Sequence, residues 1–292
     1  MESQRPSVAN PPCPAQLRRH PGRGDLSLAV EHYGSPDAPP LLFAHGFGQN
    51  RHAWRGTAAQ LAAEGWHGMA VDGRGHGDSE WAPQGAYQME HFAEDLCAIA
   101  RSVPEKPILV GASMGGLLGL LLEGEATSSV FRAMVLVDVT PRWETEGVGR
   151  ILDFMAKHPE GFDSLEHAAD EVARYLPHRD RKNPERLRSQ LRQHHDGRWR
   201  WHWDPRLLGH VAREAESYIP RLQAAARQVQ VPVLLLSGGR SDVVSARTIE
   251  EFMQLVPHAE HVCIEDATHM VVGDRNEVFT REIARFLERF RP

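Results

Sequence analysis

The chain has 292 residues, of which 41% are hydrophobic and 25% are charged, and its formal net charge is −6. These values are typical of a globular protein with one large domain, or of a domain that carries an insertion. The negative balance disfavours nucleic acid and anionic membrane as partners. The three cysteines are widely spaced and lack CxxC pairs, which argues against a disulfide scaffold and a structural zinc site.

The N-terminal segment, residues 1–20, is rich in proline and polar side chains and has no apolar core of the kind found in secretory signals. We expect it to be a disordered tail. The longest apolar run, near residues 108–122, is interrupted by glycine and serine and is too short to cross a bilayer. The sequence therefore predicts a cytoplasmic protein.

From residue 21 onward, short apolar runs alternate with helical patterns. Strands are expected at 26–34 (an edge strand), 39–48, 67–77, 108–110, 131–141, 231–239 and 261–266. Helices are expected at 53–64, 91–103, 117–122, 247–257 and 276–290. This alternation predicts an α/β fold with a mostly parallel central sheet and helices on both faces, built from residues 21–140 and 216–292.

Residues 141–215 interrupt this order because they contain no comparable strand. Apolar side chains recur at helical spacing in 148–158 and 164–177, and residues 184–195 form a third, more polar helical candidate. We expect this insertion to be a helical cap, or lid, over the strand ends.

The stretch GASMG, residues 111–115, has the G-x-S-x-G pattern of a nucleophile elbow. A buried strand precedes it and an apolar helix follows it, which is the context that the motif requires. Glycine flanks the serine where the two backbones pass closely. Ser113 is therefore the candidate nucleophile, although small-residue turns with serine are also common in purely structural roles.

A serine hydroxyl needs a base, and the base needs a carboxylate that fixes its tautomer. Asp242 and His269 follow the strands at 231–239 and 261–266, in the chain order that this motif requires. Asp138, in VLVDVTP, also ends a strand and is the alternative acid. The order of the segments favours Asp242.

Taken together, these segments resemble the α/β-hydrolase superfamily, in its serine-nucleophile branch with a helical cap. The resemblance rests on HGFG (45–48), DGRGHGDS (72–79), GASMGG (111–116), SGGRSD (237–242) and ATHM (267–270). It implies Ser113 as nucleophile, His269 as general base and acid, and Asp242 as its partner. It also implies an oxyanion hole formed by the backbone N–H groups of Phe47 and Met114. By the same resemblance, DGRGHGDS and His45 are structural.

The cap contributes candidate pocket walls, for each of which core packing is an equal explanation: Trp143, Phe154, Met155, Trp199 and Trp203. Two of them lie in RWRWHWDP (198–205), where aromatic side chains alternate with basic ones. A nucleic-acid or membrane surface would have this composition, but a cap segment with tryptophans packed inward fits the acidic chain better. No metal-ligand spacing and no G-x-G-x-x-G fingerprint are present, so we expect neither a metal nor a cofactor.

The resemblance implies a hydrolase that forms an acyl-enzyme, because the elbow carries serine where the superfamily's epoxide hydrolases and dehalogenases carry aspartate. We expect a carboxylesterase or lactonase acting on a small, largely apolar substrate. Carbon–carbon bond hydrolysis and cofactor-free perhydrolysis use the same triad and remain open. So does a binding protein of this fold without turnover. The sequence leaves the oligomeric state open.

Overall fold

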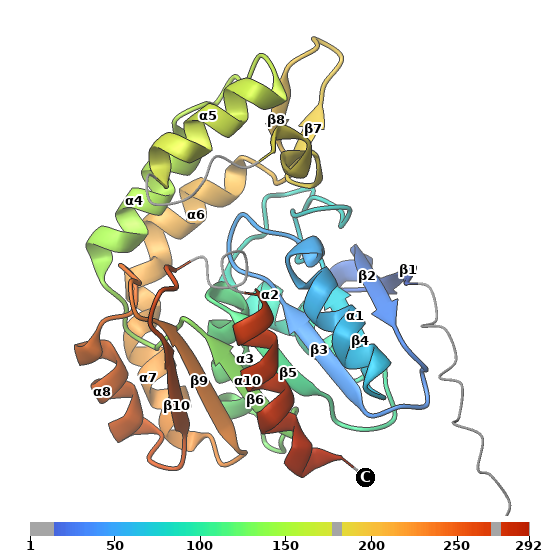
Figure 1. Cartoon of the computed structure of the whole chain (residues 1–292), viewed down its shortest axis with the longest axis vertical. Helices are drawn as coiled ribbons and strands as arrows, with labels where there is room; N and C mark the ends of the chain where they lie inside the picture. Colours follow the sequence, from blue (N-terminus) through green and yellow to red (C-terminus); the bar gives the residue numbers. More distant parts are fainter. Residues whose placement is uncertain (1–14, 177–182, 270–275, 292) are drawn as a thin grey trace, which may run out of the picture.

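The computed structural model describes residues 15–176, 183–269 and 276–291 (Figure 1). A sheet of eight strands occupies the centre, in the order β1-β2-β4-β3-β5-β6-β9-β10. Strand β2 is antiparallel to both β1 and β4, and the strands from β4 to β10 are mutually parallel. The strands are β1 (Gln16–Pro21), β2 (Ser27–Tyr33), β3 (Pro40–Ala44), β4 (His67–Val71), β5 (Ile108–Ala112), β6 (Ala133–Val137), β9 (Val233–Gly238) and β10 (Glu260–Ile264).

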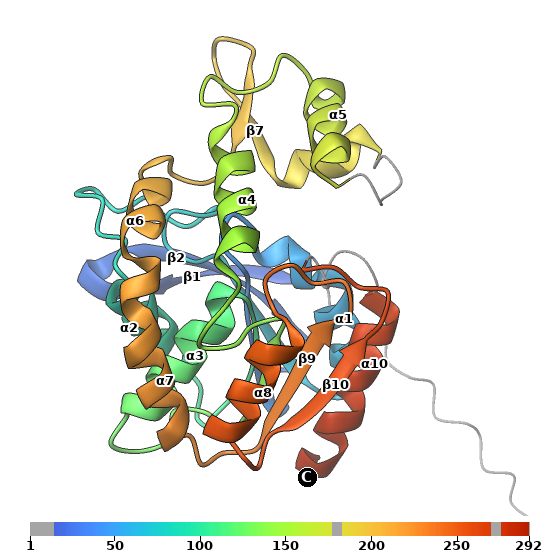
Figure 2. The same ribbon diagram turned by 90° about the vertical axis from the view of Figure 1, so that its left-hand side faces the viewer.

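Helices cover both faces of this sheet, which confirms the expected fold class (Figures 1 and 2). Helices α1 and α10 lie on one face, and α2, α3, α7 and α8 lie on the other. The helical segments outside the insertion are η1 (Arg23–Asp25), η2 (Arg51–Trp54), α1 (Arg55–Ala63), α2 (Met89–Ala100), α3 (Met114–Glu125), α7 (Ile219–Gln228), α8 (Ala246–Leu255), α10 (Asn276–Leu287) and η5 (Glu288–Phe290).

The central strands are apolar throughout because both faces of the sheet are buried. On β3, Leu41 and Phe43 pack toward α1 and α10, whereas Leu42 packs toward α2 and α3. Side chains alternate across a strand, so a continuous apolar run supplies two separate cores. Helix α10 contributes Phe279 and Ile283, four residues apart, to the first of these cores.

The N-terminal segment differs from the expected tail. Residues 16–21 form β1, which pairs with β2 from Gln16–His32 to Pro21–Ser27. Strand β1 is therefore the edge strand, and the run at 26–34, expected at the edge, lies inside the sheet. Backbone pairing with β2 supplies the order that the polar composition of this segment did not suggest. Residues 1–14 lie outside the described part of the chain.

The insertion lies beyond the carboxyl ends of the strands (Figure 2). It contains α4 (Thr145–Ala156), α5 (Leu165–Tyr175), η3 (Pro184–Ser189), β7 (Leu191–Gln193), β8 (Trp199–Trp201), α6 (Arg206–Glu214) and η4 (Ala215–Tyr218). We call residues 141–215 the cap.

The prediction of a third helix in the cap, at residues 184–195, is wrong. The chain forms the short η3 and then a hairpin, in which β7 pairs with β8 from Leu191–Trp201 to Gln193–Trp199. Asp196-Gly197, with Gly197 at φ +81°, lies in its loop. An Asp-Gly pair between β-forming residues is a hairpin signal, and it outweighs the helical spacing of the leucines.

The segment DGRGHGDS forms a buried polar network beside the sheet. Asp72 accepts hydrogen bonds from the backbone N–H groups of Arg51 (2.7 Å) and Asp78 (2.8 Å), and pairs with the Arg51 guanidinium. Arg74 binds both carboxylate oxygens of Asp95 on α2, at 2.6 and 2.7 Å. Each buried charge therefore has an opposite partner, as a structural role requires.

Within the described ranges, no helix has both the length and the apolar character needed to cross a membrane.

The Arg74–Asp95 pair generates a stability prediction. Because Arg74→Leu leaves the Asp95 carboxylate buried without its cation, we expect a loss of about 3–5 kcal/mol in the free energy of unfolding. Glu94→Gln is the control, since it removes the exposed ion pair with Arg23, and should change that free energy by less than about 1 kcal/mol. Urea denaturation measures both, and equal losses would contradict the assignment.

Candidate active site

The carboxyl ends of four parallel strands converge beneath the cap. Ser113 follows β5, Asp138 follows β6, Asp242 lies in the loop after β9, and His269 lies in the loop after β10. These strands are neighbours in the sheet, in the order β5-β6-β9-β10. In open parallel sheets, ligand sites form at this edge.

Ser113 occupies a sharp corner between β5 and α3. Its φ of 46° and ψ of −117° lie outside the regions that side chains prefer. Its N–H donates to the Val137 carbonyl at 3.0 Å, which ties the corner to β6. A Cβ on Gly115 would lie 2.4 Å from the Ala44 carbonyl oxygen, so only glycine fits there. This strained strand–turn–helix geometry is that of a nucleophile elbow.

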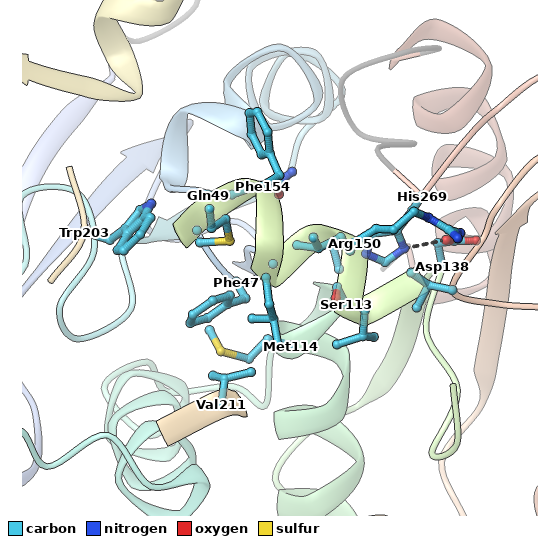
Figure 3. A pocket seen from close by; sticks show the side chains of 18 of the residues that line it. Phe47, Gln49, Ser113, Met114, Asp138, Arg150, Phe154, Trp203, Val211 and His269 are labelled. Carbon is cyan, nitrogen blue, oxygen red and sulfur yellow. Dashed lines mark hydrogen bonds and ion pairs between the residues drawn. The ribbon is translucent and has the colours of Figure 1, made fainter. Parts of the chain in front are cut away.

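His269 pairs with Asp138, and the expected partnership with Asp242 is wrong. The His269 Nδ1 lies 2.7 Å from Asp138 Oδ2 (Figure 3). The Asp138 carboxylate is 1% exposed and also accepts from the Gly238 N–H (2.7 Å) and the Ser241 hydroxyl (2.6 Å). Hydrogen bonds to both of its oxygens fix the orientation of this carboxylate.

Asp242 faces the cap instead. Its Oδ2 accepts from Arg150 of α4, at 2.8 Å from one guanidinium nitrogen and 3.2 Å from another. The inward position of the same loop belongs to Ser241, whose hydroxyl is held by the N–H groups of Val243 and Val244 at 3.2 and 3.1 Å. The loop after β9 therefore contributes a serine to the buried carboxylate and a carboxylate to the cap.

The segment after β3 lies beside the elbow. A Cβ on Gly46 would lie 3.3 Å from the Ser113 Cβ, so Phe47 is close to the nucleophile. Met114 is the first residue of α3, where backbone N–H groups lack acceptors inside the helix. The side chains of Phe47 and Met114 line the same pocket as Ser113 (Figure 3).

Two buried imidazoles hold this segment. The His45 Nδ1–H donates to the Gly46 carbonyl (2.8 Å), and its Nε2 accepts from the Gly73 N–H (2.9 Å). The His76 Nε2 accepts from the Gly48 N–H at 3.2 Å. Burial lowers the pKa of His45, and it lowers the pKa of His76 well below its ordinary value, with the neighbouring imidazoles acting in the same direction on His76. Both rings are thus neutral acceptors, as their structural role requires.

The pocket above Ser113 has a volume of about 1220 Å³ and lies between the sheet edge and the cap. Ser113, Asp138 and His269 lie on one side of it, and Phe47, Met114 and Trp203 lie on the other (Figure 3). Of the expected walls, Trp143, Phe154, Met155 and Trp203 line it.

The prediction that Trp199 forms a wall of the pocket is wrong, because this side chain packs inside the cap. Its ring lies under the Arg188 guanidinium, 5.0 Å from the ring centroid, and its backbone bridges to Phe162. Trp201, which was not among the expected walls, lines the pocket in its place and contacts Phe154 and Trp203. Two residues along a strand span about 6.6 Å, which carries Trp199 beyond the pocket.

In the described ranges, no group of three or more histidine, cysteine, aspartate or glutamate side chains is arranged to hold a metal ion. What the site does contain is a serine on a strained corner, an imidazole with a fixed carboxylate partner, and a helix N-terminus. These are the parts of acyl-transfer chemistry.

A model of the Alpha/beta hydrolase family matches residues 41–282. This chain belongs to the α/β hydrolase family. It is a hydrolase-family enzyme by this membership, and several of its relatives are esterases or other hydrolases.

Two relatives and one solved structure show how far the likeness extends. This α/β hydrolase is 30% identical to "Esterase Rv0045c" of Mycobacterium tuberculosis over 82% of this chain and 79% of the relative. It is 29% identical to the 2-(acetamidomethylene)succinate hydrolase of Mesorhizobium japonicum, over 91% and 93% of the two chains. A solved structure of E-2-(acetamidomethylene)succinate hydrolase superposes with a TM-score of 0.83 at 26% identity, covering 94% of this chain and 99% of that one.

The buried imidazoles generate a prediction on the pH dependence of stability. His202 is a cap residue whose ring lies 6.2 Å from that of His76, and burial lowers its pKa to about 3. The unfolded chain binds a proton at this residue below pH 6.5, but the folded chain does not until about pH 3. Stability is therefore full above pH 6.5 and falls as the pH decreases through this window.

His202→Asn removes this titration. Between pH 7 and pH 5 the variant should lose roughly 2 kcal/mol less unfolding free energy than the wild type. Chemical denaturation at the two pH values measures the difference. Identical losses in the two proteins would contradict the neutral, buried state of His202.

Proposed function

We propose that this α/β hydrolase cleaves a carboxylic ester or lactone of a small, largely apolar substrate through an acyl-enzyme on Ser113. The observation that carries the proposal is the 2.7 Å contact between His269 Nδ1 and the buried carboxylate of Asp138, in a pocket that Ser113 also lines from its nucleophile elbow. That contact supports a tautomer with the proton on Nδ1 and with Nε2 as the free base.

In the first half of the reaction, the Ser113 oxygen attacks the carbonyl carbon and its proton passes to His269 Nε2. The Asp138 carboxylate stabilises the resulting imidazolium. The oxygen of the tetrahedral intermediate takes the negative charge and accepts from the backbone N–H groups of Phe47 and Met114. Removing one such donor from an oxyanion hole costs on the order of 3 kcal/mol of transition-state stabilisation.

When the intermediate collapses, the carbon–oxygen bond to the leaving alcohol breaks and the alcohol takes the proton from the imidazolium. In a lactone this alcohol stays attached to the acyl group. Water then enters, loses a proton to His269 and attacks the acyl carbon, and the proton returns to Ser113 as the acid leaves.

The pocket supports a mainly apolar substrate. Its walls near the nucleophile come from aromatic and aliphatic side chains of the core and the cap: Phe47, Leu117, Trp143, Val148, Ile151, Phe154, Trp201 and Trp203. Several charged lining residues pair with one another, as Arg150 does with Asp242 and Lys157 does with Glu171. At about 1220 Å³ the cavity exceeds the usual range for small ligands, which leaves room on both sides of the scissile bond.

Ser113→Ala tests the nucleophile. It removes the only atom that forms the acyl bond in this mechanism, so hydrolysis of nitrophenyl esters should fall by at least about 10³-fold while the melting temperature stays near that of the wild type. Labelling with a fluorophosphonate should be stoichiometric in the wild type and absent in the variant. Unchanged turnover would remove the mechanism, and an inert wild type would favour a binding protein.

The two candidate acids are separated by a matched pair of variants. Asp138→Asn keeps the shape of the side chain but disturbs the His269 tautomer, and we expect kcat to fall by about 10³–10⁴-fold. Asp242→Asn breaks the ion pair with Arg150, in which the Asp242 side chain is 40% exposed, and should lower kcat by less than about tenfold. The reverse ranking in a steady-state ester assay would return the acid to Asp242.

A further inference from the structure

A histidine of the cap is buried in the loop that follows β4. His202 comes directly after β8, is 2% exposed, and accepts a hydrogen bond at Nδ1 from the Gly77 N–H at 2.7 Å. The next two residues also contact the core: Trp203 packs on Phe47, in the loop after β3, with ring centroids 6.5 Å apart, and the Asp204 N–H donates to the Gly75 carbonyl, in the loop after β4, at 2.8 Å. Residues 202–204 therefore seat the cap on the core.

Gly48, which follows Phe47, lies between two imidazoles. Its N–H donates to His76 Nε2, and the His76 Nδ1–H donates in turn to the Arg74 carbonyl at 3.0 Å. The rings of His76 and His202 are 6.2 Å apart, and the backbone of Gly48 lies near the His202 imidazole, whose Nε2 has no hydrogen-bond partner among the described residues. One ring belongs to the core and the other to the cap, so Gly48 lies where the two meet.

The cap also closes the remaining side of Gly48. This glycine has φ +75°, and a Cβ there would lie 2.5 Å from the Met155 Cε and 3.7 Å from the Trp203 Nε1. A backbone at positive φ is soft in glycine, so its conformation is set by what surrounds it. Here the surroundings include three cap residues: Met155, His202 and Trp203.

We propose that His202 is a positioning residue for the oxyanion hole: by seating the cap against Gly77 and Gly48, it fixes the orientation of the neighbouring Phe47 N–H. The effect on kcat rests on the proposed function. The structural coupling, by which the cap contacts of His202 fix the conformation of residues 45–50, does not depend on it. Burial lowers the pKa of His202 to about 3, so the ring accepts the Gly77 N–H throughout the neutral range.

Two substitutions of His202 distinguish a role in positioning the loops from a role in which the side chain only fills space. His202→Asn keeps an acceptor, because the asparagine Oδ1 lies where the histidine Nδ1 lies relative to the backbone. His202→Leu fills a similar volume but leaves the Gly77 N–H without a partner. His195→Leu, on the exposed loop of the cap hairpin, makes the same chemical change away from the site and serves as the control.

In steady-state ester hydrolysis, we expect His202→Leu to lower kcat by about 10- to 100-fold, with KM within about twofold of the wild-type value. This is a fraction of the loss seen when an oxyanion donor is removed. The kcat of His202→Asn should lie within about fivefold of the wild-type kcat, and the kcat of His195→Leu should equal that of the wild type. An unchanged kcat in His202→Leu, or equal losses in Leu and Asn at the same folded fraction, would overturn the proposal.

Hydrogen–deuterium exchange supplies a readout that needs no activity. Peptides covering residues 45–50 should exchange faster in His202→Leu than in the wild type, and at the wild-type rate in His202→Asn and His195→Leu. If the wild type shows no turnover that depends on Ser113, the proposed function fails while this experiment still decides the coupling. Unchanged exchange in His202→Leu would overturn the coupling itself.

Discussion

The site depends on one buried carboxylate. Asp138 lies at a positive φ of 48° directly after β6, and its two oxygens are occupied by Gly238, Ser241 and His269. Three loops of the sheet edge thus meet on one side chain, which fixes the imidazole relative to the strands. In the mechanism that we propose, a base fixed in this way needs little reorganisation when the proton moves, and preorganisation of this kind supplies much of an enzyme's rate.

The sheet and the motif order could be predicted from the sequence, because both depend on local patterns. Apolar runs buried on two faces indicate parallel strands, and GASMG between a strand and a helix indicates a nucleophile elbow. The position of His269 follows from the same order. These features are specified by residues that are close together in the chain.

The acid could not be chosen in the same way. Asp138 and Asp242 both follow parallel strands, and either loop reaches the same edge of the sheet. The choice depends on which side chain turns inward, and Ser241 takes that place in the loop after β9. Likewise, the pairing of β1 with β2 and of β7 with β8 depends on partners elsewhere in the chain, so polar composition and leucine spacing were misleading there.

The seat formed by residues 202–204 has a consequence for chimeras between members of this family. Exchanging the whole cap at its two junctions would carry away the acceptor of the Gly77 N–H and the ring that covers Phe47. A transplant restricted to α5 and η3 would leave these contacts in place and still replace Val172 and Leu187 of the pocket lining. If the proposed function holds, the residues that select the substrate and the residues that set the rate lie in different segments of the cap.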